Sequence, residues 1–437
     1  MKACITFTQQ TIKYFFFLMI LVAQFSCTKT QKSDSSTVQD GSSNLAIPAL
    51  FERTGDLAKA TEWQKTREKV DELKKKLAKD PNDIKIRLQI VNIYLSEARI
   101  TGEHPYYYPA VLKILDGVLY LSPNNFEATT FKASVKMSQH QFAEARELAE
   151  AARKINPDNA YVYGVLVDAN VELGFYKEAI AMSDKMQALK PSLESYSRAS
   201  YLREIYGDLK GSISAMKLAV EAGMPGSEPF CWSKKTLAHL YESSGELNKA
   251  QQQYDDILVV RPSYAFAYAG QARILKVNKQ YDKALEVLDK AAKIMPEFSF
   301  HEEMAEIYDL QGNHEKALNK YQEVVQMLNQ DTKSGHAVDL ELCKLYTKAG
   351  KIDMAMKHGL IEYKNRPKNI DVNHAMAVVA FKTNDFKKAK QYMLIALSTG
   401  SKDPELLEDA SKIDRTLANG QFGYQPIIVA NKGVLYK

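Results

Sequence analysis

The chain has 437 residues, of which 45% are hydrophobic and 25% charged, with 14 Pro and 20 Gly. This composition is ordinary for a soluble protein and excludes a globally disordered or collagen-like chain. The formal net charge of +5 indicates neither nucleic-acid binding nor attraction to a membrane surface.

The first 26 residues are expected to form an export signal. Lys2 and Lys13 precede the apolar run YFFFLMILVAQF. A run of this length is typical of a signal peptide, whereas a membrane span needs roughly 20 apolar residues. The small residue before Cys27 resembles the lipobox of bacterial lipoproteins. That resemblance implies acylation of Cys27 and a lipid anchor in a bacterial cell envelope, facing the periplasm or the cell surface; ordinary cleavage and an uncleaved anchor remain alternatives.

Residues 27–54 are expected to form a flexible tether behind this anchor. The stretch TKTQKSDSSTVQDGSSN has almost no apolar residue, so it cannot offset its ordering entropy. Residues 55–82 should then hold the N-terminal helix of a degenerate repeat, running from Asp56 to Lys79. Its apolar stripe comprises Leu57, Trp63, Val70, Leu73 and Leu77.

Evenly spaced prolines divide the rest of the chain. They fall 34 residues apart in two runs, Pro123, Pro157, Pro191 and Pro225, then Pro262 and Pro296. Because proline ends the helix before it, the spacing indicates one helix-turn-helix unit copied many times. The spacing breaks twice: the interval from Pro81 to Pro123 is 42 residues, and position 330 is not proline.

In seven of the units a Gly, Asn or Lys stands five residues before a small residue, as in Gly245 and Ala250. The first residue adopts the left-handed conformation that ends a helix, and the second lets two helices approach closely. One unit aligns in full as Leu237, Ala238, Tyr241, Gly245, Ala250, Tyr254 and Pro262.

This pattern resembles the tetratricopeptide repeat. The resemblance implies an all-α fold, a right-handed superhelical α-solenoid of about nine repeats over residues 83–403. Residues 404–437 should form a capping helix and a tail, which either packs on the cap or docks to another protein. Two interpretations are open for Tyr106, Tyr107 and Tyr108: they begin a second helix and staple the turn, or they grip a partner.

No motif indicates catalysis, a cofactor or a metal. The eight histidines form no H-E-x-x-H spacing, and the chain has no G-x-S-x-G or phosphate-binding glycine loop. Cys231 and Cys343 fall in different repeats and are expected to be buried free thiols. We therefore expect a protein that is not an enzyme.

The family resemblance also implies a concave groove lined by first-helix residues of each repeat. Aromatic side chains interleaved with cations can anchor peptides or acidic partners, although the same residues could simply solvate the helices. The residues placed there are Tyr161, Tyr201, Trp232, Lys235, His239, Phe266, Arg273 and Lys276.

Together these features indicate an envelope-anchored scaffold or adaptor that binds other proteins or peptides, in outer-membrane assembly, secretion or cell-wall metabolism. Two alternatives remain open. One is a glycan- or nutrient-binding surface lipoprotein. The other is a membrane-anchored regulator facing the cytoplasm.

Overall fold

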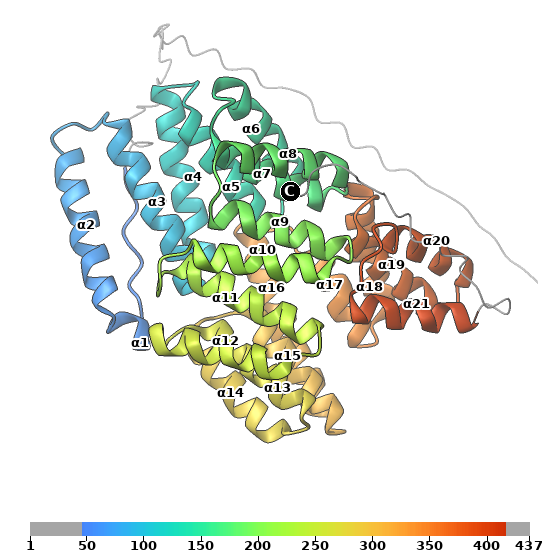
Figure 1. Cartoon of the computed structure of the whole chain (residues 1–437). Coiled ribbons are helices and arrows are strands. Elements are labelled where there is room, and N and C mark those ends of the chain that lie inside the picture. Colours follow the sequence, from blue (N-terminus) through green and yellow to red (C-terminus); the bar gives the residue numbers. More distant parts are fainter. Residues whose placement is uncertain (1–45, 417–437) are drawn as a thin grey trace, which may run out of the picture. The chain divides into compact units, whose positions relative to one another are not determined.

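The computed structural model describes residues 46–416, which contain 21 helices and no strand (Figure 1). The chain divides into two units, Met1–Gly41 and Ser42–Lys437, and every described residue belongs to the second. Cys27, the expected signal and the expected tail lie outside the described residues, so lipidation and the role of the tail stay predictions. Within residues 46–416, no helix combines the length and the apolar character needed to cross a bilayer.

Eighteen helices form nine consecutive pairs, which we call the first and second helices of each repeat (Figure 1). This confirms the expected all-α solenoid of about nine repeats. The pairs are α3 (Ile84–Thr101) with α4 (His104–Leu121), α5 (Phe126–Ser138) with α6 (Phe142–Ile155), α7 (Ala160–Glu172) with α8 (Tyr176–Leu189), α9 (Leu193–Ile205) with α10 (Leu209–Glu221), α11 (Glu228–Ser243) with α12 (Leu247–Val260), α13 (Ala265–Val277) with α14 (Tyr281–Ile294), α15 (Phe298–Leu310) with α16 (His314–Lys333), α17 (Asp339–Lys348) with α18 (Ile352–Asn365), and α19 (Ile370–Lys382) with α20 (Phe386–Ala396).

Local chemistry explains where the paired helices begin and turn. Asn125 caps α5 by accepting a 2.9 Å hydrogen bond from the Ala128 amide, and Asn369 caps α19 in the same way. A small residue at the start of the second helix, expected from the sequence for the pairs from α7 to α20, is fully buried in every pair from α5 to α20. These residues are Ala145, Ala179, Ser212, Ala250, Ala284, Ala317, Ala355 and Ala389. The helices of a pair can therefore pack closely.

The last helix, α21 (Pro404–Thr416), packs on α19 and α20 as a cap. Its Leu406, Ala410 and Ile413 are buried and join the apolar core that contains Met393. The expected capping helix is therefore present. The two buried cysteines, Cys231 and Cys343, are free thiols as expected.

The leading helix differs from its prediction because the chain breaks it in two. Helix α1 (Gly55–Ala58) and helix α2 (Thr61–Leu77) are separated at Ala60, whose ψ of 134° is extended. Trp63, Val70 and Leu73 of the predicted stripe are buried on α2. The apolar pattern therefore predicted correctly which face of α2 is buried, but it did not predict the break between α1 and α2.

Residues 46–54 also differ from the flexible tether expected up to residue 54. This stretch is extended and packs on the core of α2 to α4 through Ile47, Leu50 and Phe51. The guanidinium of Arg53 donates to both carboxylate oxygens of Glu97, at 2.8 and 2.6 Å, and both residues are buried. Apolar side chains and a paired charge therefore hold this stretch against the repeats.

The three adjacent tyrosines begin the second helix α4, which is the first of their two predicted roles. The hydroxyl groups of two of them also bind the chain's own N-terminal stretch. The hydroxyl of Tyr106 donates to the Ala49 carbonyl at 2.5 Å, and that of Tyr107 donates to the Phe51 carbonyl at 3.3 Å. Both tyrosines thus bind residues of the same chain.

Contacts also join residues about 195 positions apart in the sequence. With a 34-residue repeat, this separation corresponds to roughly six repeats per turn of the solenoid, so successive turns touch. We call this contact the seam. Its clearest pairs are Glu62 with Arg261, Gln139 with Ser334, Glu172 with Arg366, and Gly207 with Gly400.

The two breaks in proline spacing both lie at the seam. Without a proline at position 330, α16 continues for 20 residues, and the loop after it reaches the turn between α5 and α6. There Gln139 donates to the Ser334 carbonyl at 2.9 Å and accepts from the Ala337 amide at 2.9 Å. The longer first hairpin places Gly102 against Met295. Both irregular repeats therefore contribute contacts to the seam, beside those of the regular repeats.

Candidate functional site

Four aromatic side chains line a cavity of about 690 Å³ bounded mainly by the first helices of five repeats; Phe131 is half-buried and the other three are more exposed. Tyr161, Tyr201 and Trp232 are 43%, 39% and 43% exposed, in contrast to buried aromatic residues such as Tyr254. Leu95, Leu193 and Met216 extend the apolar lining. We call this cavity the aromatic groove. An aromatic or aliphatic side chain of a ligand would find both apolar surface and polar edges there.

Acidic residues outnumber basic ones around the aromatic groove. Arg198 forms an ion pair with Asp168 at 2.6 Å, and Arg99 forms one with Glu228 at 3.3 Å. The further acids of the lining are Glu172, Glu194 and Glu204. Within residues 46–416, neither Glu194 nor Glu204 forms an ion pair with a lysine or arginine. The two basic residues of the lining are therefore already paired, and carboxylates remain.

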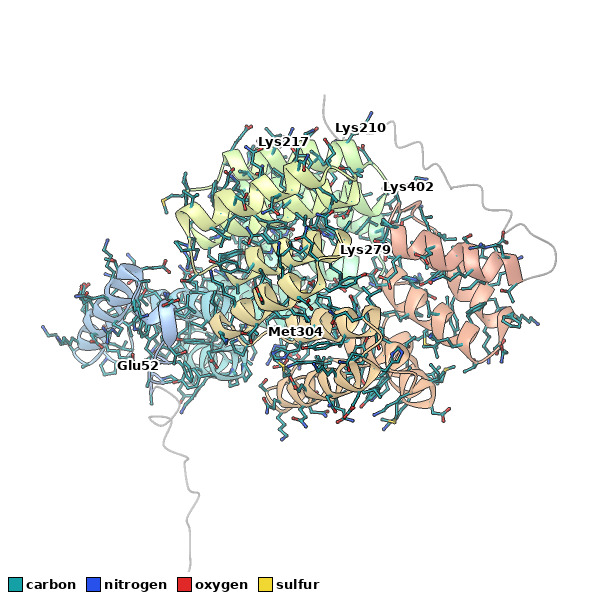
Figure 2. The ribbon with its side chains drawn as sticks, turned by 90° about the horizontal axis from the view of Figure 1, so that it is seen from below. Glu52, Lys210, Lys217, Lys279, Met304 and Lys402 are labelled. Atoms are coloured by element: carbon teal, nitrogen blue, oxygen red, sulfur yellow. The ribbon has the colours of Figure 1, made fainter. Side chains whose placement is uncertain are left out.

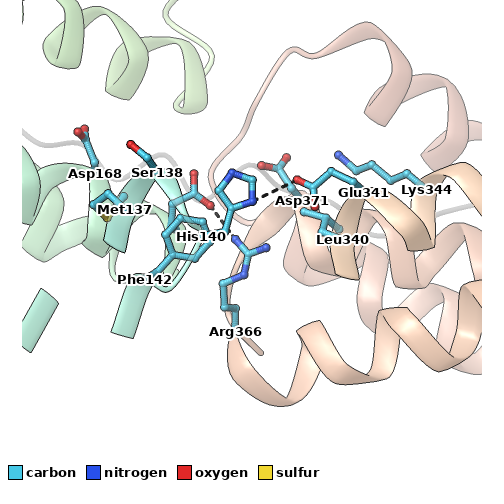
Figure 3. Close-up of a pocket in the computed structure, with 11 residues that line it drawn as sticks. Met137, Ser138, His140, Phe142, Asp168, Leu340, Glu341, Lys344, Arg366 and Asp371 are labelled. Carbon is cyan, nitrogen blue, oxygen red and sulfur yellow. Dashed lines mark hydrogen bonds and ion pairs between the residues drawn. The ribbon is translucent and has the colours of Figure 1, made fainter. Parts of the chain in front are cut away.

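A second cavity of about 480 Å³ lies at the seam and shares Asp168 and Glu172 with the groove (Figure 3). Arg366 and Glu172 form an ion pair across the seam at 2.7 Å. His140 faces Glu341 at 3.5 Å (Figure 3). Burial raises the pKa of Glu172 to about 7, partly offset by the attraction of Arg366. Glu172 is therefore a carboxylate that exchanges a proton near neutral pH.

A third cavity of about 390 Å³ shares Ser138, His140 and Glu341 with the second and contains two further histidines. The ring of Tyr108 lies 5.1 Å from that of His104 and 5.5 Å from that of His336, and the two imidazole rings are 6.4 Å apart. Burial lowers the pKa of His104 to about 4 and also lowers the pKa of His336. Both imidazoles are therefore neutral at pH 7.

The remaining five predicted groove residues lie on α11 and α13, outside these three cavities. Lys235 lies over the ring of Phe266 at 5.9 Å, and His239 is exposed near Glu242. Arg273 bridges Glu242 and Glu303, both at 3.1 Å, and Lys276 pairs with Glu306 at 2.9 Å. Arg273 and Lys276 are therefore neutralised within the chain, and the role of these five residues in binding stays a prediction.

A regular charge spacing in the sequence explains these pairs. An acid and a base stand 30 residues apart on successive first helices. This separation is shorter than the 34-residue repeat by about one turn of helix. The pairs are Asp168 with Arg198, Arg273 with Glu303, and Lys276 with Glu306. This spacing is visible in the sequence and could have identified them. The seam residues His140 and Arg366 have no such local signal.

Comparison with known proteins agrees with the helix-pair architecture. Residues 136–199 and residues 235–300 both match family models of the tetratricopeptide repeat. The chain carries tetratricopeptide repeats. This confirms the family resemblance seen in the repeat register, and the described helices form a solenoid of such repeats.

Curated relatives cover part of the chain. A stretch of 239 residues, 52% of the chain, is 25% identical to the mitochondrial import receptor subunit TOM70 of Homo sapiens and spans 39% of that protein. A stretch of 241 residues is 20% identical to the TPR repeat-containing protein MJ1428 of Methanocaldococcus jannaschii, covering 51% of this chain and 42% of that one. The chain thus matches about two-fifths of the length of these relatives.

Solved structures with similar folds include the human IFIT1 dimer, with a TM-score of 0.49 and 15% identity over 79% of this chain and 80% of that one. Another is the TPR protein TTC0263 of Thermus thermophilus, with a TM-score of 0.39 and 19% identity over 44% of this chain and 98% of that one.

Proposed function

We propose that the chain is a scaffold or adaptor that binds partner polypeptides through the aromatic groove. The observation that carries this proposal is the exposure of Tyr161, Tyr201 and Trp232 within one cavity. Large aromatic side chains that converge in a concave site are the usual anchors of polypeptide ligands, because they bury much area at little conformational cost. Similarity to a protein named as an import receptor subunit supports a receptor-like role.

A photoreactive residue placed at the groove tests this proposal in cells. Substitution at Trp232 should give covalent adducts with one or a few defined polypeptides. The matched control is Val259 on α12, which is 80% exposed and does not line the groove. Absence of adducts at position 232, or the same adducts from both positions, would contradict groove binding. Calorimetric binding of an oligosaccharide with no polypeptide adduct would instead favour the glycan-binding alternative.

We further propose that Cys27 carries a lipid that holds the repeats at a membrane of a bacterial envelope. The lipobox-like sequence and the polar stretch after it support this proposal. There the scaffold would serve outer-membrane assembly, secretion or cell-wall metabolism, facing the periplasm or the cell surface.

Metabolic labelling with a fatty acid tests the anchor. Cys27→Ala should abolish the label and release the protein from membranes. Cys343→Ala, at a buried free thiol, is the control and should retain the label. A Cys27→Ala protein that stays labelled and membrane-bound would rule out this anchor. Protease accessibility in spheroplasts then separates an outward-facing scaffold from a regulator facing the cytoplasm.

A further inference from the structure

The three cavities adjoin one another and define a single surface. The aromatic groove and the second cavity share Asp168 and Glu172, and the second and third cavities share Ser138, His140 and Glu341. We call the surface formed by all their lining residues the interior path. Because it begins along the first helices of five repeats and continues past turns and the end of α16 at the seam, it can contact a ligand at several points, as an extended polypeptide requires.

The interior path is strongly acidic, although the whole chain is basic. Ten acids and four lysines or arginines line it, an excess of six negative charges, whereas the chain carries +5. The acids are Glu103, Asp168, Glu172, Glu194, Glu204, Glu228, Glu297, Asp331, Glu341 and Asp371. The basic residues are Arg99, Arg198, Lys344 and Arg366. Positive charge lies elsewhere, as at Lys210 and Lys217, which point outward from α10 (Figure 2).

Ion pairs inside the path leave this excess of negative charge unchanged and use up most of its positive charge. Arg99, Arg198 and Arg366 each already form an ion pair with a lining acid. Seven acids then remain against Lys344. Burial raises the pKa of Glu204, and it does the same for Glu297 and Asp331 in the third cavity. Such carboxylates would be stabilised in their charged form by an added cation.

Helix α9 places charge and apolar surface side by side. Glu194, Tyr201 and Glu204 follow at intervals of seven and three residues, which puts them on one face of the helix. All three line the aromatic groove, and Trp232 contributes further aromatic surface from α11. An apolar side chain of a ligand at Tyr201 would therefore have a carboxylate on each side.

We infer that the interior path takes an extended, basic polypeptide segment in which lysines or arginines flank an aromatic or aliphatic anchor. The anchor packs among Tyr161, Tyr201 and Trp232, and the flanking cations pair with Glu194 and Glu204. Acidic segments are repelled by the same carboxylates. This inference rests on the proposed function and adds the chemical class of the partner. It keeps the peptide that the sequence allowed and replaces the acidic partner, which was the other option, with a basic one.

Fluorescence anisotropy with three labelled peptides of equal length tests the inference. Each peptide carries the same leucine and phenylalanine residues, and the other positions are lysine, glutamine or glutamate. The lysine peptide should bind at least about tenfold more tightly than the other two, and its affinity should fall as salt is raised. The double variant Glu194→Gln and Glu204→Gln should weaken that binding roughly tenfold.

The control variant removes the same charge from the outer helices. Glu178 on α8 and Glu286 on α14 are exposed and lie outside the interior path. Glu178→Gln with Glu286→Gln should leave the affinity unchanged, and thermal melts verify that both double variants fold. Equal binding of the glutamate peptide, or equal weakening by the control, would overturn the inference. Adducts at position 232 would then still support polypeptide binding at the groove. If position 232 gave no adducts and the peptides showed no charge preference, both the proposed function and the basic-partner inference would be wrong.

Discussion

Glycines at equivalent turns of the repeats meet different surroundings. Gly174, Gly207 and Gly245 all adopt a left-handed backbone, with φ of +78°, +73° and +76°. A Cβ atom at Gly174 would lie 2.4 Å from the carbonyl carbon of Lys368, and one at Gly207 would lie 2.4 Å from the Gly400 oxygen. Around Gly245 nothing lies within 4 Å. Gly174 and Gly207 are therefore required both by the left-handed turn and by the close backbone contact at the seam. Gly245 is required only by its left-handed turn.

Alanine substitutions separate these two roles. Gly245→Ala should cost about 1 to 2 kcal/mol of stability, because an L-residue is strained in the left-handed conformation. Gly174→Ala carries the same strain and also forces the backbone of residue 368 away, so its cost should be larger. Hydrogen exchange of residues 366–370 should accelerate only in Gly174→Ala. Equal stability losses with unchanged exchange would contradict a packed seam.

A second pair of substitutions distinguishes packing residues from surface residues of the repeats. Ala250 is fully buried between α11 and α12, and Lys235 lies over Phe266 outside that contact. Ala250→Leu should lower stability by about 1 to 3 kcal/mol through overpacking. Lys235→Ala should leave the melting temperature nearly unchanged. Equal losses of melting temperature would show that Lys235 belongs to the packed interior.

At the scale of elements, the N-terminal stretch acts as an added element of the first repeat. Extended residues 46–54 lie on α2 to α4, with their carbonyl groups satisfied by side chains of the repeat. Besides Tyr106 and Tyr107, Tyr94 donates to the Pro48 carbonyl at 2.7 Å. This stretch covers apolar surface at the open end of the array, as a terminal unit of a solenoid must.

Removal of two hydroxyl groups should loosen this stretch without disturbing α4. The double variant Tyr106→Phe and Tyr107→Phe retains the rings and loses hydrogen bonds worth about 1 kcal/mol each. Proteolysis within residues 46–54 should become faster by roughly tenfold or more if both bonds contribute independently. Tyr120→Phe, at a residue that is 72% exposed, is the matched control and should have no effect. Unchanged cleavage in the double variant would mean that Arg53 and the apolar contacts suffice.

The sequence predicted what is local and repeated. Helix pairing, the buried alanine at positions such as Ala250 and the left-handed turns each follow from a few neighbouring residues. The seam could not be predicted in this way, because it depends on the rotation accumulated over roughly six repeats, where small changes per repeat add up. The cationic groove was expected for a related reason: Arg273 and Lys276 are cationic in sequence, but they are neutralised by partners 30 residues away and lie outside the cavities.

At the scale of the whole molecule, the seam contains groups whose titrations oppose each other. The lowered pKa of His104 means that the folded state binds fewer protons than the unfolded state between about pH 4 and 6.5. Its contribution to stability is present above pH 6.5 and is lost as pH falls. The raised pKa of Glu172 gives the opposite sign: its contribution is present below about pH 4.5 and is lost as pH rises to about 7. In the wild-type protein the two contributions to the pH dependence of stability therefore oppose and largely hide each other.

Single neutral variants should therefore reveal a pH dependence that the wild type conceals. Glu172→Gln removes the group that stabilises the fold on acidification, so its stability should fall relative to the wild type between pH 7 and pH 4.5, by up to about 3 kcal/mol. His104→Gln should show the reverse, gaining relative to the wild type over the same range. Melting temperatures at half-unit intervals of pH measure both differences. All other titrating groups are common to the three proteins. If the difference in melting temperature between each variant and the wild type did not vary with pH, neither His104 nor Glu172 would have a shifted pKa at the seam.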